Sequence, residues 1–295
     1  MKENYDIGDN EVRVVGGEDG KGRNPRLLRT IIAVAACVAM AAIIVILAIV
    51  LLKDKASETP SNGTTDVQGT GNTPTAADSI WFCNTDNSRA SEIALSDTLI
   101  DSINLQILTP YNVSPELYVG QIDTTDRTIL FASQAADLAR ERGKIVGAFV
   151  CAGEPLSWGL SKKGYCAIFG DSITVGMAEN SPLFEQATEV GGYFFRQYPA
   201  VSNGKMVENK PQNSSFRRAL CTLNGKICVI YTPDRVLMND FSTALAKLGV
   251  KDGIFLVGST AHGWYRSPDN DNVVQLGFPR APRMKNVNYL IFRRQ

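Results

Sequence analysis

Three ionisable side chains in this sequence are suited to chemistry. Arg218 belongs to an Arg-Arg pair, Glu154 follows Gly153, and His262 lies four positions after Gly258. An arginine guanidinium can bind two oxygens of an anion at once, and the amide groups of glycine-rich turns bind anions without a side chain. Carboxylates and imidazoles exchange protons with substrates. These residue types indicate binding of an anionic group together with acid–base chemistry.

Glu154 is the preferred carboxylate because of its neighbours. It lies beside Pro155 and four positions before Trp158. An aromatic ring can stack on a sugar, and an apolar environment raises the pKa of a carboxylate. Asp171 and Glu179 are weaker candidates. Cys151 ends an apolar segment with no base nearby, so we interpret it as an inert, buried thiol.

Each of these residues also has a plain structural interpretation. Arg217 and Arg218 could both be surface residues of a strand, with one on each face. A single histidine such as His262 is more often structural than catalytic. Glu154 could be an exposed loop residue, and Asn203-Gly204 could form an ordinary hairpin turn. The residue types alone leave these alternatives open.

The order of the segments around these residues resembles the phosphodiester glycosidase family. An extended aromatic segment (191–207) ends in Ser-Asn-Gly, a paired-Arg strand turns at Asn-Gly (216–232), and a short helix leads to a buried strand that stops at Gly-Ser (240–265). The resemblance covers roughly residues 144–294, and Gly159-Leu160 also matches the family. It implies cleavage of a sugar from a phosphate at the anomeric carbon.

The resemblance implies specific roles. It assigns Arg218 to the phosphate, Glu154 to the sugar side, and general acid or base character to His262. The residues that it implies for substrate contacts are Gly153, Trp158, Ser202, Asn203, Gly204, Gly258 and Ser259. Two positions depart from the family pattern, because Val257 stands where the family has Asp and Cys151 where it has Asn. The alternative is therefore a non-catalytic carbohydrate-binding or envelope-scaffold domain on the same fold.

The elements that must position these residues indicate an α+β fold with a mixed, mainly antiparallel sheet. We expect helices at residues 133–142, 182–189 and 240–248, with Ser181 and Asn239 as N-terminal caps. The expected strands are residues 144–151, 165–169, 172–175, 193–201, 253–257 and 289–293. Asn224-Gly225 predicts a two-residue hairpin turn between two further strands.

Cysteine and histidine usage indicates no metal site. The chain has six cysteines, no Cys-x-x-Cys pair and one histidine, so no ligand spacing predicts a zinc site. A requirement for a divalent cation stays open. The turn at Asn224-Gly225 places Cys221 opposite Cys228, at a distance that a disulfide could bridge. Two reduced, buried thiols are the preferred interpretation of that pair.

The N-terminal part predicts a membrane anchor. Residues 31–52 form an uncharged apolar run of 22 residues, long enough to cross a hydrocarbon core of about 30 Å. More Lys and Arg precede the run than follow it, which predicts a cytoplasmic tail (1–30) and an extracytoplasmic C-terminal domain at the cell membrane. Residues 53–78 read as a flexible linker, and residues 79–295 as one domain.

Charge and location limit the partners. The formal net charge is zero, which offers no electrostatic footprint for nucleic acid. The expected partners are a sugar phosphodiester or an envelope glycan, and a lipid bilayer through the single apolar segment.

Overall fold

The computed structural model describes residues 80–139, 143–259, 261–277 and 287–295. The chain divides into two compact units, Met1–Thr73 and Pro74–Gln295, and all described residues belong to the second unit. The predicted tail, membrane segment and linker lie outside the described residues. Within the described ranges, no helix combines the length and the apolar character needed to cross a bilayer.

Within the described residues, eighteen strands form three sheets. The first has six strands in the order β1-β9-β8-β10-β6-β7. These are β1 (Ile80–Phe82), β6 (Phe149–Cys151), β7 (Glu154–Ser157), β8 (Gly164–Phe169), β9 (Ser172–Met177) and β10 (Tyr193–Gln197). The strands predicted at residues 165–169 and 172–175 are confirmed as β8 and β9, which pair across the turn at Gly170-Asp171.

The second sheet has seven strands in the order β12-β11-β15-β13-β14-β3-β2. These are β2 (Glu92–Ile100), β3 (Ile103–Tyr111), β11 (Pro199–Ser202), β12 (Lys205–Met206), β13 (Ser215–Leu223), β14 (Lys226–Val236) and β15 (Val250–Leu256). The hairpin predicted at Asn224-Gly225 joins β13 to β14, and Cys221 pairs with Cys228 as expected. Both cysteines are buried, free thiols.

The third sheet has five strands in the order β17-β16-β5-β18-β4. These are β4 (Val113–Val119), β5 (Ile129–Gln134), β16 (Gly263–Arg266), β17 (Val273–Gln275) and β18 (Asn288–Arg294). Among the described residues, every strand pair in the three sheets is antiparallel. Together with the two helices of the described residues, these antiparallel sheets are consistent with the predicted α+β class.

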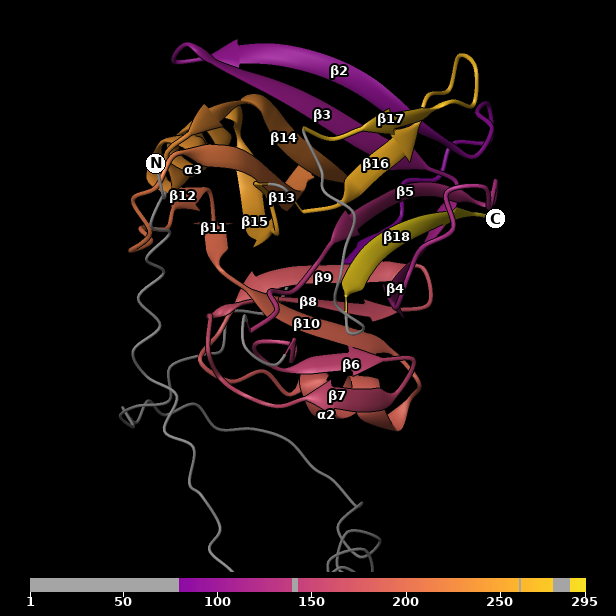
Figure 1. Cartoon of the computed structure of the whole chain (residues 1–295), viewed down its shortest axis with the longest axis vertical. Coiled ribbons are helices and arrows are strands. Elements are labelled where there is room, and N and C mark those ends of the chain that lie inside the picture. The colour runs from indigo at the N-terminus through magenta and orange to yellow at the C-terminus, as the bar shows by residue number, and fades with distance from the viewer. Residues whose placement is uncertain (1–79, 140–142, 260, 278–286) are drawn as a thin grey trace, which may run out of the picture. The chain divides into compact units, whose positions relative to one another are not determined.

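The three sheets share one core and differ in what covers their other faces (Figure 1). Apolar side chains from all three sheets meet in the shared core, among them Phe195, Leu220 and Phe131. The helix α2 (Leu183–Glu189) packs on the other face of the six-stranded sheet. The helix α3 (Met238–Leu248) packs on the other face of the seven-stranded sheet. Their amphipathic patterns require such a cover.

No helix of the described residues covers the other face of the five-stranded sheet. A small cluster that includes Trp264, Tyr289 and Ile291 lies there. The partly buried residues packed against it include Ile122 and Leu138, from the loops after β4 and β5. We call this surface, with its residues His262, Gln134, Trp264, Tyr289 and Tyr118, the outer face of the five-stranded sheet.

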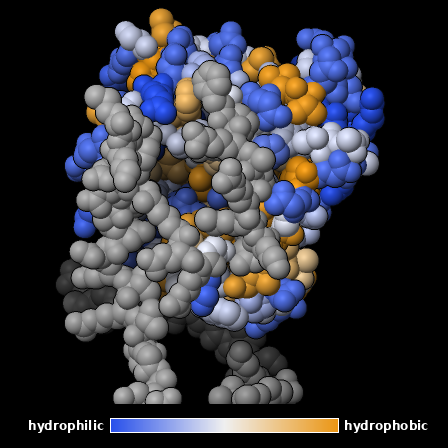
Figure 2. All heavy atoms as spheres, viewed as in Figure 1, coloured by the Kyte–Doolittle hydropathy of each residue, from blue (hydrophilic) through white to orange (hydrophobic). Residues whose placement is uncertain are grey.

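Hydrophilic residues make up most of the visible surface of the described residues on one side of the domain (Figure 2). Figure 2 shows hydrophilic residues over most of the described part of that side, with hydrophobic residues in small separate groups. This agrees with a chain whose apolar residues are used mainly between and behind the sheets.

The predicted helix at residues 133–142 is wrong where the structure describes it. Ser133 and Gln134 end the strand β5, and Ala135 and Ala136 are irregular. The backbone of Ala136 is instead paired with the Asn288 side chain, which donates to its carbonyl and accepts from its amide at 3.2 and 2.7 Å. Tertiary partners override the helix propensity of an alanine-rich segment. Residues 140–142 lie outside the described residues.

Two smaller predictions also need correction. The strand expected at residues 144–151 is only three residues long, because Gly147 adopts a φ of +86° that interrupts an extended strand. Asn239 does not cap the helix predicted at residues 240–248. It lies inside α3, where its side chain forms two hydrogen bonds with the backbone of Asn209. Ser181 does accept a hydrogen bond from the Leu183 amide at 3.3 Å, as a cap should.

Candidate functional site

The residues predicted for the site lie at three separate places in the fold. Glu154, Gly153 and Trp158 belong to the region of the β6–β7 hairpin, and residues 202–204 form the turn between β11 and β12. Arg218 meets residues 258–262 at the end of β15. No contact among the described residues joins these three places to one another through the predicted side chains.

The β6–β7 hairpin lies at the edge of the six-stranded sheet. β7 is its outermost strand, and the Glu154 side chain is exposed. Trp158 is 68% exposed, so its ring is free to contact solvent or a ligand. Gly153 packs against α2's C-terminal side, where an added Cβ would lie 2.9 Å from the Cα of Gly191. Cys151 is half-buried and donates to the Leu117 carbonyl at 3.3 Å, and burial raises its thiol pKa.

The turn at residues 202–204 uses its amides inside the protein. The Asn203 amide donates to the Asp252 carboxylate at 2.9 Å, and the Gly204 amide donates to the Lys251 carbonyl at 2.7 Å. Both residues have positive φ, as a tight hairpin turn requires. The amides that the sequence suggested for a ligand therefore fix this hairpin to β15.

Arg218 is the centre of the third place. Its side chain is 1% exposed and points into the shared core from β13. Its Nη2 donates to the carbonyls of Ala261 and Leu276 at 2.9 and 2.8 Å. Its Nη1 donates to the Ser133 hydroxyl at 3.2 Å and to the His262 carbonyl at 3.4 Å. The guanidinium thus ties β13, β5 and the loop before β16 together.

Two glycines allow this close packing. The Nη1 of Arg218 lies under Gly263, where an added Cβ would be 2.2 Å away. At Gly258, an added Cβ would lie 2.1 Å from the carbonyl oxygen of Phe216. The next amide, of Ser259, donates to that same carbonyl at 3.0 Å. At the predicted strand end, the backbone at Gly258 therefore passes very close to the backbone of Phe216.

The electrostatics of this junction are unusual for buried charges. Burial lowers the pKa of Arg218 to about 10, so the guanidinium stays charged at neutral pH. The described residues give Arg218 carbonyl and hydroxyl acceptors and no carboxylate. Burial and the nearby Arg218 charge hold the pKa of His262 below its ordinary value of 6.5. The imidazole is therefore neutral at neutral pH and can accept a proton.

His262 also begins a row of polar side chains across the outer face of the five-stranded sheet. Its carbonyl accepts the Gln134 amide at 3.1 Å. Gln134 is the register partner of Tyr289, and Tyr289 is the partner of Tyr118. The rings of His262 and Tyr289 meet edge to face, with centroids 6.0 Å apart. The strands β5, β18 and β4, together with the residue before β16, thus place four hydrogen-bonding side chains in one line.

Most of this row was not predicted from the sequence. The predicted site residues include His262 but not Gln134, Tyr289 or Tyr118, nor the neighbouring Trp264. A weak signal was present, because His262, Trp264 and Arg266 alternate along one strand and so share a face. The register that brings Tyr289 beside Gln134 joins distant parts of the chain and cannot be read from one sequence.

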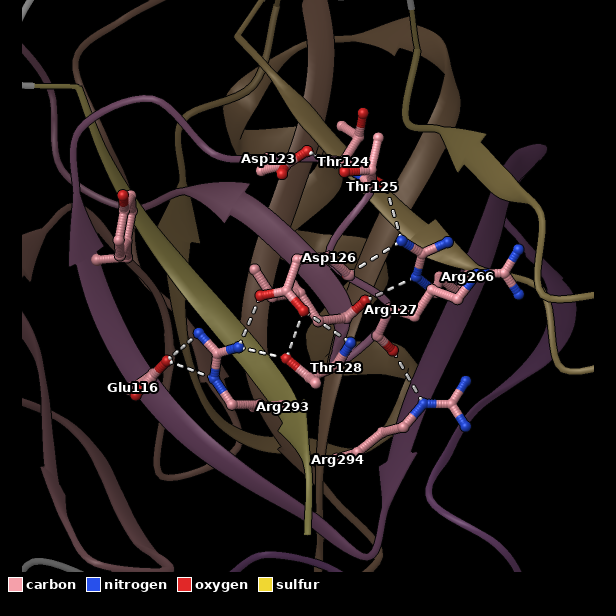
Figure 3. A network of polar contacts seen from close by, with 12 residues as sticks. Glu116, Asp123, Thr124, Thr125, Asp126, Arg127, Thr128, Arg266, Arg293 and Arg294 are labelled. Carbon is pink, nitrogen blue, oxygen red and sulfur yellow. Dashed lines mark hydrogen bonds and ion pairs between the residues drawn. The ribbon is translucent and has the colours of Figure 1, made fainter.

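A network of charged residues fixes one end of the same face (Figure 3). Arg266 donates to the carbonyls of Thr124 and Asp126 at 2.7 and 3.1 Å. Arg293 bridges the carboxylates of Glu116 and Asp126 at 2.9 and 3.0 Å. Both arginines hold the loop between β4 and β5 against the sheet. Their guanidinium groups therefore already have acceptors within the protein.

The described residues contain no group of three or more His, Cys, Asp or Glu side chains that could hold a metal ion. At the junction, the Arg218 guanidinium supplies a fixed positive charge and donates to the backbone carbonyl of His262, whose imidazole is neutral.

Comparisons with known proteins give a fold relationship. No protein-family model matches the chain, and no curated protein sequence matches it. Among solved structures, the chain is similar to the catalytic domain of zebrafish N-acetylglucosamine-1-phosphodiester alpha-N-acetylglucosaminidase, auto-inhibited by its pro-peptide. The TM-score is 0.50 at 15% identity, over 74% of this chain and 88% of that one.

A hypothetical protein from Synechocystis is also similar, with a TM-score of 0.43 at 12% identity, over 68% of this chain and 61% of that one. At such low identities a likeness describes the fold alone. The described residues thus form a three-sheet α+β domain that is distantly related in fold to the catalytic domain of a phosphodiester glycosidase.

Proposed function

We propose that the domain hydrolyses a sugar 1-phosphodiester and that the chain displays it on the outer side of a cell membrane. The observation that carries this proposal is the meeting of Arg218 and His262, from separate segments, at one strand end. The fold likeness to a sugar–phosphodiester hydrolase supports it. The family-like order of turns in the sequence supports it as well.

The proposed reaction uses both side chains. The oxygen of a water molecule bonds to the anomeric carbon while the bond from that carbon to the phosphate oxygen breaks. The phosphate monoester leaves with the electron pair, and the water proton passes to the neutral imidazole of His262. The buried charge of Arg218 favours an anionic substrate at the junction through its field, because no described carboxylate neutralises it.

We assign proton transfer to His262 in preference to Glu154. Arg218 donates to the backbone carbonyl of His262 and its charge lowers the pKa of the His262 imidazole, whereas the Glu154 side chain is exposed on an edge strand with no described contact to Arg218 or His262. A base must lie within hydrogen-bonding reach of the proton that it removes. Glu154 therefore provides the matched comparison for a test.

The test uses the purified full chain in detergent and an N-acetylglucosamine-phosphoryl-methyl ester. We expect release of free N-acetylglucosamine, and a loss of at least about 100-fold in turnover for His262→Gln. Glu154→Gln should stay within about twofold of the unchanged chain, because neither the fold nor the proposed proton transfer depends on it. Denaturant unfolding of His262→Gln checks that the variant is folded. Equal turnover of His262→Gln and the unchanged chain would refute the assignment.

A second candidate function is carbohydrate binding without catalysis. The observation that favours it is that both terminal nitrogens of Arg218 already have protein acceptors. Val257 and Cys151, which replace polar residues of the family pattern, favour it too. This function predicts that sugar phosphodiesters bind while no free sugar appears, with or without Ca²⁺ or Mg²⁺. Calorimetry on the same substrate panel separates the two functions.

A further inference from the structure

The outer face of the five-stranded sheet contains three buried polar atoms without partners. These are Nδ1 of His262, Nε1 of Trp264 and the hydroxyl oxygen of Tyr289, and none of them has a hydrogen-bond partner within the described part of the chain. The Trp264 and Tyr289 side chains are 0% exposed. About nine in ten buried polar groups in native proteins are paired, so three unpaired atoms on one face need an explanation.

The three atoms belong to one place and not to scattered sites. His262 directly precedes β16 and is two residues from Trp264, the second residue of that strand, so the two side chains point to the same side. Tyr289 lies across β5 from them, in register with Gln134, and its ring contacts that of His262. The apolar members of the same cluster, such as Ile291 and Ala132, continue the face along the next row.

We propose that this face binds the uncharged ring of the sugar, with hydroxyl groups bonded to His262, Trp264 and Tyr289. The inference rests on the proposed function for the kind of ligand, and on the unpaired atoms for its location. Sugar hydroxyls both donate and accept hydrogen bonds, and aromatic rings pack against the apolar faces of sugars. One ligand of this class would satisfy all three atoms at once.

The protonation of the site fits a neutral ligand. Burial raises the pKa of Tyr289 to about 12, so its hydroxyl keeps its proton. The lowered pKa of His262 leaves a neutral imidazole with one donor and one acceptor. The indole of Trp264 can only donate. The face therefore offers a mixed, uncharged set of donors and acceptors.

A phosphate group fits this face less well than an uncharged sugar ring does. Three arginines near this face, Arg218, Arg266 and Arg293, are each bonded to acceptors within the protein. Arg266 lies over the Trp264 ring at 5.5 Å, with its nitrogens turned to the carbonyls of the loop between β4 and β5. A dianion would meet a neutral imidazole and a protonated phenol, and the guanidinium groups of these three arginines already have protein acceptors.

A ligand would reach the outer face of the five-stranded sheet from the side where the residues of the row are less buried. His262 and Gln134 are half-buried, and Tyr118 is 39% exposed. A ring that enters beside His262 places its hydroxyls toward Tyr289 and the indole nitrogen. His262 would then contact the sugar and serve the proposed proton transfer from the same position.

The experiment titrates the full chain, labelled with ¹⁵N at tryptophan, with N-acetylglucosamine and separately with inorganic phosphate. The chain has three tryptophans, and the Trp264 indole signal is assigned by its loss in Trp264→Phe. We expect the sugar to shift the Trp264 signal and phosphate to leave it unchanged. Tyr289→Phe should weaken sugar binding roughly three- to tenfold, since one hydrogen bond is lost.

A matched control lies on the same sheet. Tyr265 precedes Arg266 on β16 and points to the shared core, on the opposite face from Trp264. Tyr265→Phe should bind the sugar as the unchanged chain does. In the absence of sugar, Tyr289→Phe should be no less stable in urea than the unchanged chain, because its hydroxyl has no protein partner to lose. A hydroxyl with a purely structural role would give the opposite result.

The outcomes separate this inference from the proposed hydrolysis. A shift of Trp264 without release of sugar from the phosphodiester supports the binding face and refutes the hydrolysis. Release of sugar that Tyr289→Phe does not alter, with no shift of Trp264, refutes the binding face and leaves the hydrolysis intact. A loss of stability in Tyr289→Phe with no response to sugar would mean that the face holds ordered water only, and would also refute the proposal.

Discussion

Arg218 shows how one residue can have different meanings in a sequence and in a fold. The Arg-Arg pair suggests a ligand-binding cation, but the folded guanidinium makes four hydrogen bonds to protein acceptors. Its charge remains buried and without a carboxylate partner among the described residues. Arg218 thus shapes the field of the junction and holds together the segments that form it.

This bonding predicts a large effect on stability. Arg218→Ala should destabilise the domain by more than about 3 kcal/mol, because several buried carbonyls lose their donor. The matched control is the neighbouring Arg217, which is half-buried and donates to the carbonyl of Val236 at 3.3 Å. Arg217→Ala should cost about 1 kcal/mol. Urea unfolding of the full chain measures both, and equal effects would contradict the structural role of Arg218.

His262 predicts a specific dependence of stability on pH. Its pKa in the folded protein lies below the ordinary value of 6.5, so the unfolded chain binds the proton more tightly. The stability contributed by the neutral imidazole is fully present above pH 6.5 and is lost as the pH falls below that value. Urea midpoints at about pH 8 and about pH 5.5 should therefore differ more in the unchanged chain than in His262→Gln. Identical differences would show that this histidine does not titrate as described.

At the scale of elements, the β13–β14 hairpin is the part that the sequence determines most directly. Asn224 and Gly225 have φ values of +50° and +75°, as a two-residue turn of this type requires. Local turn chemistry therefore sets the register of both strands, including the pairing of Cys221 with Cys228. The prediction succeeded because all its determinants lie within a few residues.

The turn can be tested by two substitutions. Gly225→Ala should destabilise the domain by about 1 kcal/mol, since a Cβ is disfavoured at positive φ. Asn224→Gly is the control and should have a smaller effect, because glycine also adopts this conformation. Thermal unfolding measures both variants. A Gly225→Ala variant as stable as the unchanged chain would mean that the turn relaxes to another type.

Other elements could not be predicted because their determinants are distant. The segment 133–142 has local helix propensity, yet β5 forms because β16 and β18 pair with its two edges. The same distance hides the candidate site. Arg218 lies beside residues 258–262 because β13 and β15 are neighbours, whereas Glu154 and Asn203 lie at other places in the fold. Tyr289 and Trp264 were missed, since their place depends on the register of strands from different parts of the chain.

At the scale of the whole molecule, the membrane segment predicted at residues 31–52 remains to be tested. Protease added to intact spheroplasts that express the full chain should remove the C-terminal domain and spare an N-terminal tag. Detergent-lysed spheroplasts are the control, because protease then reaches both ends. A C-terminal domain that survives protease in intact spheroplasts but not after lysis would reverse the predicted orientation.

The position of β18 has a consequence for the time course of folding. This strand lies between β4 and β5 in the five-stranded sheet, and its Arg293 bonds to Glu116, 177 residues earlier in the chain. During synthesis, the edges of β4 and β5 that bind β18 stay unpaired until almost the whole domain has been synthesised. Contacts over such separations form slowly, and open strand edges invite mispairing. The five-stranded sheet should therefore be the last to close, and this is the stage at which the chain depends most on protection from aggregation.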